Sequence, residues 1–162
     1  MKKLLYILAL TMVGTPALAD TCDTEEQIHA LAMNMYHEAR GEGHDAMQMV
    51  GEVTLNRVEN EHFPDNICGV VYQARFDNRG NPVRHRCQFS WFCDGRSDKP
   101  HNKDAWDNAM SIAEGLVNGT IDLIGIDATH YHTTAVSPRW SRKYTVVGQY
   151  GDHIFYHMGN RL

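Results

Sequence analysis

The sequence predicts an α+β fold, with a compact helical part first and a small antiparallel sheet last. Apolar residues recur three and four positions apart in three segments of the first two thirds of the chain. The last third instead holds short β-branched and aromatic runs separated by glycine, proline or serine. We find no repeat, linker or low-complexity tract, so one domain of ordinary size is expected.

The first helix is the most clearly marked. Thr24 and Gln27 match a capping box, in which side chains satisfy the free backbone groups of a helix start. We expect a helix over about 25–40, ended by Gly41 and Gly43. Its buried stripe consists of Ile28, Leu31, Ala32, Met35 and Ala39.

Two further helices follow the same pattern. Asp45 with Gln48 is expected to open one that runs to about Asn60, and Asp104 to cap one that stops at Gly119. Between them, residues 67–72 are apolar and fit a short helix or strand. Residues 73–101 are rich in turn-forming residues, so we expect a long loop there.

Strands are expected near the C-terminus. The runs 129–133, 144–147 and 153–156 are β-branched or aromatic, and turn residues separate them. They predict a small antiparallel sheet or hairpin that closes the domain.

The N-terminal residues match a secretory signal peptide. Lys2 and Lys3 precede a short apolar run, and Ala17 and Ala19 supply the small residues of a cleavage site. We expect residues 1–19 to be removed and residues 20–162 to be a single exported domain in the periplasm or extracellular envelope, free of the membrane.

The four cysteines are expected to be oxidised in such a compartment. Four cysteines allow three pairings. Because Cys87 and Cys93 bracket a short segment, the preferred pairing is Cys87–Cys93 with Cys22–Cys68.

The charge balance argues against nucleic acid as a partner. The chain has 15 Lys and Arg against 20 Asp and Glu, a formal net charge of −5, and loss of Lys2 and Lys3 would make it more acidic. Nucleic-acid binding depends on a dense basic face.

Glu38 is the acid that stands beside the apolar stripe of the first helix. A carboxyl held among apolar groups keeps its proton to higher pH, which suits a general acid. An ion pair between Glu38 and Arg40 or Arg57 is the structural alternative.

Several ordered sequence blocks resemble the SleB/CwlJ-type cell-wall hydrolase family, over about residues 28–157. The blocks are 36–43 (Tyr-His-Glu-Ala-Arg-Gly-Glu-Gly), 53–58 (Val-Thr-Leu-Asn-Arg-Val), 63–64 (Phe-Pro), 70–73 (Val-Val-Tyr-Gln), 88–90 (Gln-Phe-Ser), 131–132 (Tyr-His) and 151–156 (Gly-Asp-His-Ile-Phe-Tyr). The resemblance implies a lysozyme-like or lytic-transglycosylase-like fold that acts, without a cofactor, on peptidoglycan glycan strands. It places the catalytic glutamate at Glu38.

The resemblance does not supply a second catalytic carboxylate, which an ordinary glycoside hydrolase requires. Glu42 is the nearest candidate, although a helix-end charge is the more economical interpretation of it. A lytic transglycosylase needs no second carboxylate, because groups of the substrate assist closure of an anhydro ring. The resemblance therefore favours that outcome over hydrolysis.

Polar and aromatic side chains are expected to line a sugar-binding groove. Candidate substrate-binding residues are Gln88, Ser90, Tyr131 and Asn56, the last of which, with Arg57, is also expected to orient the motif around Glu38. Phe89 is expected to hold the long loop on the core. The basic insertion 75–86 is either a grip for peptide stems and wall polymers or a solvated loop.

Two other functions fit parts of the sequence. Ten histidines, among them His130, His132, His153 and His157, are compatible with a zinc amidase or peptidase, but no His-Glu-x-x-His signature is present. A wall-binding module without activity would not need a buried acid at Glu38. We therefore expect a monomeric enzyme with no metal, cleaving the bond between N-acetylmuramic acid and N-acetylglucosamine.

Overall fold

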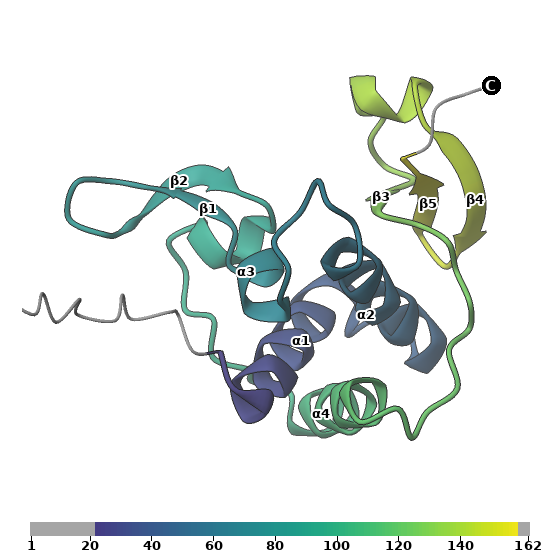
Figure 1. Cartoon of the computed structure of the whole chain (residues 1–162), viewed down its shortest axis with the longest axis horizontal. Coiled ribbons are helices and arrows are strands. Elements are labelled where there is room, and N and C mark those ends of the chain that lie inside the picture. Colours follow the sequence, from purple (N-terminus) through teal and green to yellow (C-terminus); the bar gives the residue numbers. More distant parts are fainter. Residues whose placement is uncertain (1–21, 159–162) are drawn as a thin grey trace, which may run out of the picture.

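Four α-helices form the body of the molecule, and two small antiparallel sheets stand on either side of it (Figure 1). The structure, a computed structural model, describes residues 22–158. The expected signal peptide, 1–19, lies outside the described residues. The α+β prediction is confirmed, with helices first and most strands last. The elements in chain order are α1 Thr24–Ala39, α2 His44–Val58, α3 Ile67–Val71, β1 Ala74–Phe76, β2 Pro82–Cys87, the 3-10 helix η1 Ser90–Cys93, α4 Lys103–Val117, β3 His130–Thr133, the 3-10 helix η2 Arg139–Arg142, β4 Thr145–Tyr150 and β5 His153–His157.

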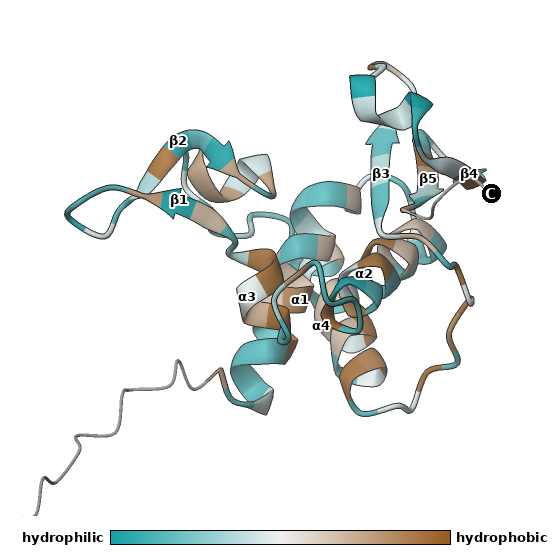
Figure 2. Ribbon diagram, turned by 45° about the horizontal axis from the view of Figure 1, so that its top comes forward, coloured by the Kyte–Doolittle hydropathy of each residue, from teal (hydrophilic) through white to brown (hydrophobic). Residues whose placement is uncertain are grey.

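Helix α1 is the centre of the core and packs against α2, α3 and α4. Its Leu31 and Met35 are fully buried, and burial of each such side chain stabilises the fold by about 1.5–3 kcal/mol. The helices approach closely at Gly51, where a Cβ atom would lie 2.7 Å from Leu116 Cδ1 and 2.8 Å from Met35 Sδ. Figure 2 shows apolar residues on these four helices and a largely polar β1–β2 hairpin projecting from them.

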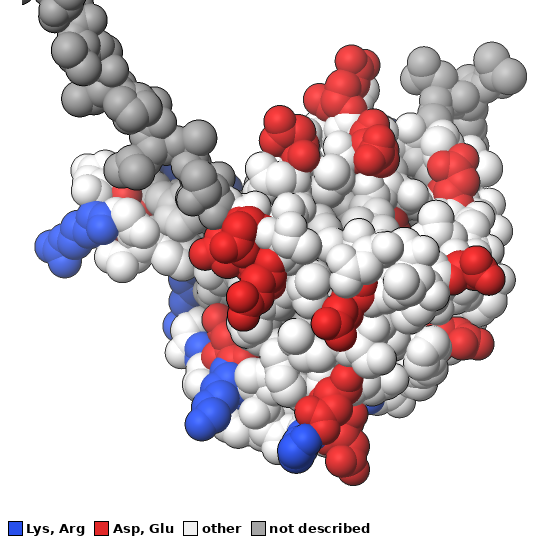
Figure 3. Space-filling model, turned by 60° about the horizontal axis from the view of Figure 1, so that its bottom comes forward, with Lys and Arg blue, Asp and Glu red and all other residues white. Residues whose placement is uncertain are grey.

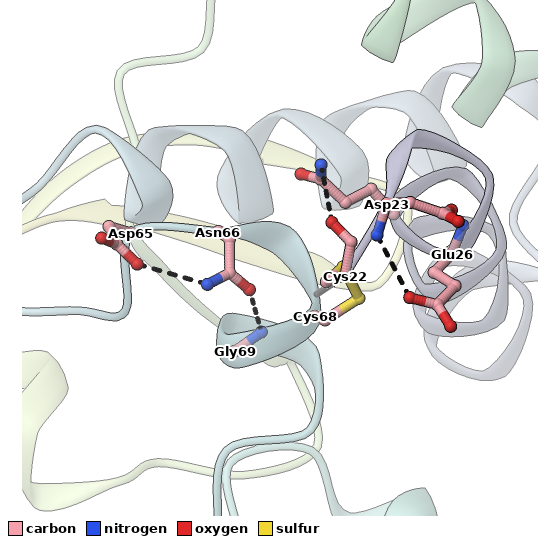
Figure 4. Close-up of a disulfide and its surroundings, with 8 residues drawn as sticks. Cys22, Asp23, Glu26, Asp65, Asn66, Cys68 and Gly69 are labelled. Carbon is pink, nitrogen blue, oxygen red and sulfur yellow. Dashed lines mark hydrogen bonds between the residues drawn. A yellow bond between two sulfur atoms is a disulfide. The ribbon is translucent and has the colours of Figure 1, made fainter. Parts of the chain in front are cut away.

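The N-terminal cap of α1 lies one residue earlier than predicted. Asp23 Oδ1 accepts from the Glu26 amide at 2.9 Å, and the Asp23 amide donates to Glu26 Oε2 at 3.1 Å (Figure 4). The prediction of Thr24 with Gln27 was wrong because both registers satisfy the same spacing rule. The extended backbone of Asp23 selects the register.

The starts of α2 and α4 also differ from prediction. Helix α2 has Gly43 at its cap, at φ 90°, with no side-chain cap, so Asp45 lies inside the first turn. Asn102 rather than Asp104 caps α4, accepting from the Ala105 amide at 3.0 Å. In both cases the acid instead lies where the helix dipole favours negative charge.

Residues 73–101 are not simply a loop, because they contain the hairpin β1–β2 and η1. The hairpin turn is built on Asp77, whose Oδ1 accepts from the Arg79 and Asn81 amides at 2.8 and 2.9 Å. Strand β2 is largely exposed. It therefore lacks the apolar alternation by which a half-buried strand is identified.

The second sheet has the order β3-β5-β4 and confirms the three predicted strands with small changes of boundary. Tyr131 of β3 pairs with Phe155 of the central strand β5. Phe155 is fully buried and forms a second apolar cluster with residues of α2, among them Met49 and Val53. This cluster fixes the sheet on the helical body.

Two disulfides close the framework, and the preferred pairing is confirmed. Cys22–Cys68 joins the start of α1 to α3 (Figure 4). Cys87–Cys93 joins the end of β2 to η1. Within the described residues no cysteine is free.

Acidic side chains are spread over the face shown in Figure 3, whereas Lys and Arg gather along one edge. This is not the dense basic face that nucleic acid requires. No helix between residues 22 and 158 has the length and apolar character of a membrane span.

We predict that the two disulfides contribute unequally to stability. Cys22–Cys68 closes a separation of 46 residues and Cys87–Cys93 one of only 6. Loop-closure entropy then gives about 4 and about 2 kcal/mol. Urea unfolding of the two double Cys→Ala variants measures both values; an equal loss in the two variants contradicts the prediction.

Candidate active site

Glu38 stands on the last turn of α1 and faces β3. The Tyr131 hydroxyl donates a hydrogen bond of 3.1 Å to Glu38 Oε2. Burial raises the pKa of Glu38, and this effect outweighs the Tyr131 hydrogen bond and the charges of His153 and Arg57, which lower it. The carboxyl therefore holds a proton at higher pH than an exposed glutamate does.

The Tyr131 ring packs against two residues of β5. The ring lies edge-on to His153 at 5.2 Å between centroids and packs on Phe155 at 5.7 Å. Burial, together with the Glu38 charge, raises the pKa of Tyr131, so its hydroxyl stays protonated as a donor. The predicted groove residue thus contacts Glu38 itself.

The Glu42 carboxylate contacts the turn between β4 and β5 and the start of β5. Its Oε2 lies 2.9 Å from His153 Nδ1 and accepts from the Asp152 amide at 3.1 Å. Helix α1 ends at Ala39, so Glu42 is on the connection to α2. Its partner could not be predicted from local spacing, because His153 lies 111 positions away along the chain.

Asn56 and Arg57 hold the chain that leads into β3. Asn56 Nδ2 donates to the Ile126 and Ala128 carbonyls at 2.7 and 2.9 Å, and Arg57 Nε donates to the Thr129 carbonyl at 2.7 Å. These contacts support the orienting role predicted for both residues. The amide of Asn56, also predicted to bind substrate, is thereby engaged with the backbone.

Arg57 is a buried cation beside the site. Its guanidinium lies 5.3 Å from the Phe63 ring centroid and 5.2 Å from that of Phe89. Burial lowers the pKa of Arg57, while the neighbouring Tyr131 and Glu38 act in the opposite direction. Its Nη1 has no hydrogen-bond partner among the described residues. Arg57 therefore places positive charge near Glu38.

Gln88 and Ser90 are exposed on either side of the buried Phe89. The Gln88 backbone amide donates to the Gln73 backbone carbonyl at 2.8 Å, which fixes this segment at the base of the hairpin. Phe89 contacts Arg57, as expected for a residue that holds the segment on the core. The two polar side chains remain predicted substrate contacts.

Sequence reasoning missed Glu52, which is 3% exposed in the middle of α2. Its carboxylate accepts from the backbone amides of Ile124, Gly125 and Ile126 and from Gln48 Nε2. The sequence feature that could have identified Glu52 is a carboxylate within an apolar helical stripe. Its hydrogen bonds show that Glu52 anchors the segment between α4 and β3.

The histidines of the zinc hypothesis have other partners. His132 Nε2 lies 2.8 Å from the Tyr156 hydroxyl, and His157 Nδ1 lies 3.2 Å from Asp127 Oδ1. Among residues 22–158, no group of three or more potential ligand side chains is arranged around a common point.

A cavity of about 640 Å³ adjoins the same end of α1, between that helix and the segment 91–102. Glu38 does not line it. A second cavity, of about 860 Å³, lies at the Cys22–Cys68 disulfide beneath β1.

The chain holds a wall-degrading enzyme domain, because residues 41–156 match the family described as cell wall hydrolase. The chain belongs to this family. The matched range begins three residues after Glu38.

Two similar proteins are spore cortex-lytic enzymes. The chain is 27% identical over 143 residues to a spore cortex-lytic enzyme of Oceanobacillus iheyensis, covering 88% of this chain and 46% of that protein. It is 38% identical over 50 residues to a spore cortex-lytic enzyme of Halalkalibacterium halodurans, covering 31% of this chain and 15% of that protein. The chain therefore spans less than half of these relatives.

Two solved structures share the fold. The catalytic domain of the germination-specific lytic transglycosylase SleB from Bacillus anthracis has a TM-score of 0.60 at 24% identity, covering 84% of this chain and 98% of that one. The catalytic domain of the Bacillus cereus SleB protein has a TM-score of 0.57 at 24% identity, covering 82% of this chain and 91% of that one.

Tyr131→Phe is predicted to raise the pKa of Glu38. The Tyr131 hydroxyl stabilises the carboxylate form of Glu38. Without it, the effect of burial, which raises the pKa, is opposed less strongly. NMR titration of the Glu38 side-chain carboxyl measures the change. Tyr144→Phe, which removes a hydroxyl from another half-buried tyrosine, serves as the control. An unchanged or lowered Glu38 pKa contradicts the assigned hydrogen bond.

Glu38→Gln is predicted to stabilise the fold at neutral pH. Between the ordinary Glu value of 4.5 and the higher folded pKa, the folded wild type binds more protons than the unfolded chain. Wild-type stability from this group therefore falls as pH rises through that window, and Gln removes the effect. Urea unfolding across pH should show a growing advantage for Glu38→Gln that levels off above the folded pKa. Glu114→Gln, on the exposed face of α4, is the control, and a constant difference would contradict the raised pKa.

Proposed function

We propose that this protein cleaves the β-1,4 bond between N-acetylmuramic acid and N-acetylglucosamine in peptidoglycan, as a lytic transglycosylase with Glu38 as general acid and base. The observation that carries the proposal is the half-buried Glu38, with its raised pKa and its hydrogen bond to Tyr131. Membership of the cell wall hydrolase family supports the substrate class.

The chemistry begins with a proton on Glu38. Glycosidic cleavage needs an acid that protonates the leaving oxygen while positive charge develops on the sugar ring. Once the proton has left, the Tyr131 hydroxyl and the charge of Arg57 stabilise the new carboxylate. That carboxylate then accepts the proton of the sugar hydroxyl that closes the anhydro ring.

The environment of Glu42 supports the route with one carboxylate. A hydrolase needs a second carboxylate to act as base or nucleophile. Glu42 contacts His153 and the Asp152 amide, and its side chain is only 20% exposed. Its carboxylate is thus used to position the β4–β5 turn. The name of the similar Bacillus anthracis protein, a lytic transglycosylase, points the same way.

The two disulfides support an exported protein, in the periplasm or extracellular envelope, because such bonds persist in oxidising compartments. We propose that residues 1–19 direct this export and that the remaining domain acts as a monomer on glycan strands.

Glu38→Gln is predicted to abolish wall cleavage, because the amide keeps the shape of the side chain but cannot deliver a proton. The loss should reach at least the ~10²- to 10⁴-fold typical of general acid catalysis. Glu42→Gln should keep far more activity. Turbidity of a peptidoglycan suspension gives the rates, and thermal melting of each variant shows that the fold is kept.

Mass spectrometry of the released fragments tests the outcome of the reaction. Anhydro sugars support the transglycosylase, whereas fragments heavier by one water indicate hydrolysis. Near-wild-type activity of Glu38→Gln would overturn the proposal. An equal collapse of both variants would favour a mechanism with two carboxylates.

A further inference from the structure

The cavity beside the end of α1 is lined by charged groups of both signs that are not paired with one another. Arg40, Arg96 and Lys99 line it together with Asp94 and Asp98. No ion pair within the described residues joins any of these five side chains. Asp94 Oδ1 accepts from the Arg96 backbone amide at 2.8 Å, and the Arg40 guanidinium lies 5.0 Å from the Tyr36 ring centroid. Neither contact neutralises a charge, so charges of both signs remain available to a ligand.

The Tyr36 hydroxyl adds a directed donor to the same cavity. Its oxygen accepts from the His101 and Asn102 amides, each at 3.0 Å, so its lone pairs are engaged. These backbone donors and the charge of Arg40 lower the pKa of Tyr36. Its own proton has no acceptor among the described residues, and Tyr36 lines the cavity. That proton is thus left to donate to a ligand.

The cavity wall is rigid. His37 stacks on Trp91 at 4.7 Å between ring centroids, and its Nε2 lies 2.9 Å from the Asp98 carbonyl oxygen. The Cys87–Cys93 bridge and the α4 cap at Asn102 fix the two ends of the facing segment. Such preorganisation lowers the entropy cost of binding.

We propose that this cavity binds the peptide stem of the glycan strand, at a residue that carries both a carboxylate and an ammonium group. The diamino acid of peptidoglycan stems has this chemistry. Arg40, Arg96, Lys99 and the Tyr36 hydroxyl are suited to the carboxylate, and Asp94 and Asp98 to the ammonium group. The inference rests on the proposed function for the identity of the polymer.

The width of a helix is comparable to the length of a short peptide stem. Tyr36 and Arg40 are one helical turn apart, and Glu38 lies between them in sequence but on the other flank of α1. A helix with its side chains is about 10–12 Å across, and three extended residues span about 10 Å. Because Glu38 is on the last turn, a stem attached to the sugar beside it can pass over the end of the helix.

Binding of an isolated stem tripeptide that ends in a diamino acid tests the proposal by calorimetry, with the Glu38→Gln protein. Loss of charge-assisted hydrogen bonds in the Arg96→Ala/Lys99→Ala variant should weaken binding about tenfold or more. Arg139→Ala/Lys143→Ala removes two exposed cations on and next to η2 and should bind like the parent. No measurable binding to the parent protein, or equal loss in both double variants, would overturn the proposal.

The ammonium group is tested with the same peptide acetylated on its side-chain amine. Acetylation should weaken binding to the parent protein and have no further effect on Asp94→Asn/Asp98→Asn. An equal effect of acetylation in both proteins would exclude Asp94 and Asp98 as partners of the ammonium group.

Activity separates this inference from the proposed function. On strands that carry stems, Arg96→Ala/Lys99→Ala should raise KM several-fold, whereas on strands stripped of stems by an amidase it should match wild type. Peptide binding does not need Glu38 chemistry. A Glu38→Gln protein that still cleaves the wall would therefore refute the proposed function and leave the binding result to stand alone.

Discussion

The hydrogen bond from the Tyr131 hydroxyl to the Glu38 carboxylate joins segments 93 positions apart in the chain. It requires β3 to lie against the last turn of α1, and three separate contacts keep it there. Asn56 and Arg57 hold the backbone that enters β3, Glu42 holds the turn before β5, and Phe155 fixes the central strand on α2. The site therefore depends on how the sheet is docked, more than on any one loop.

Three glutamates of this region have different roles because their surroundings differ. Glu38 has one hydrogen-bond donor and is desolvated by burial, which favours its neutral form. Glu42 meets His153 and a backbone amide, and Glu52 meets three backbone amides and a glutamine. Carboxylates that receive several donors serve as anchors, which leaves Glu38 as the one suited to exchange a proton.

The two disulfides constrain two different segments that border the helical body. Cys22–Cys68 fixes the start of α1 against α3, and Cys87–Cys93 fixes the segment that carries Phe89 and Trp91. Phe89 packs on Arg57, and Trp91 Nε1 donates to Asn34 Oδ1 in the core at 3.2 Å. The polar residues Gln88 and Ser90 are thus presented to solvent from a segment whose buried neighbours are fixed.

The class of fold and the three long helices could be predicted from the sequence, and Glu38 could be selected as the candidate acid, because helical periodicity and the family blocks are local patterns. The sequence also favoured the observed disulfide pairing. It misplaced the helix caps, where two registers of Asp, Thr and Asn compete, and missed β1 and β2, whose exposed strands carry no apolar alternation. The contacts of Tyr131 with Glu38 and of His153 with Glu42 are seen only in the folded chain. Both contacts depend on the docking of β3 and β5 against α1 and α2, and no local spacing encodes a pairing across about a hundred residues.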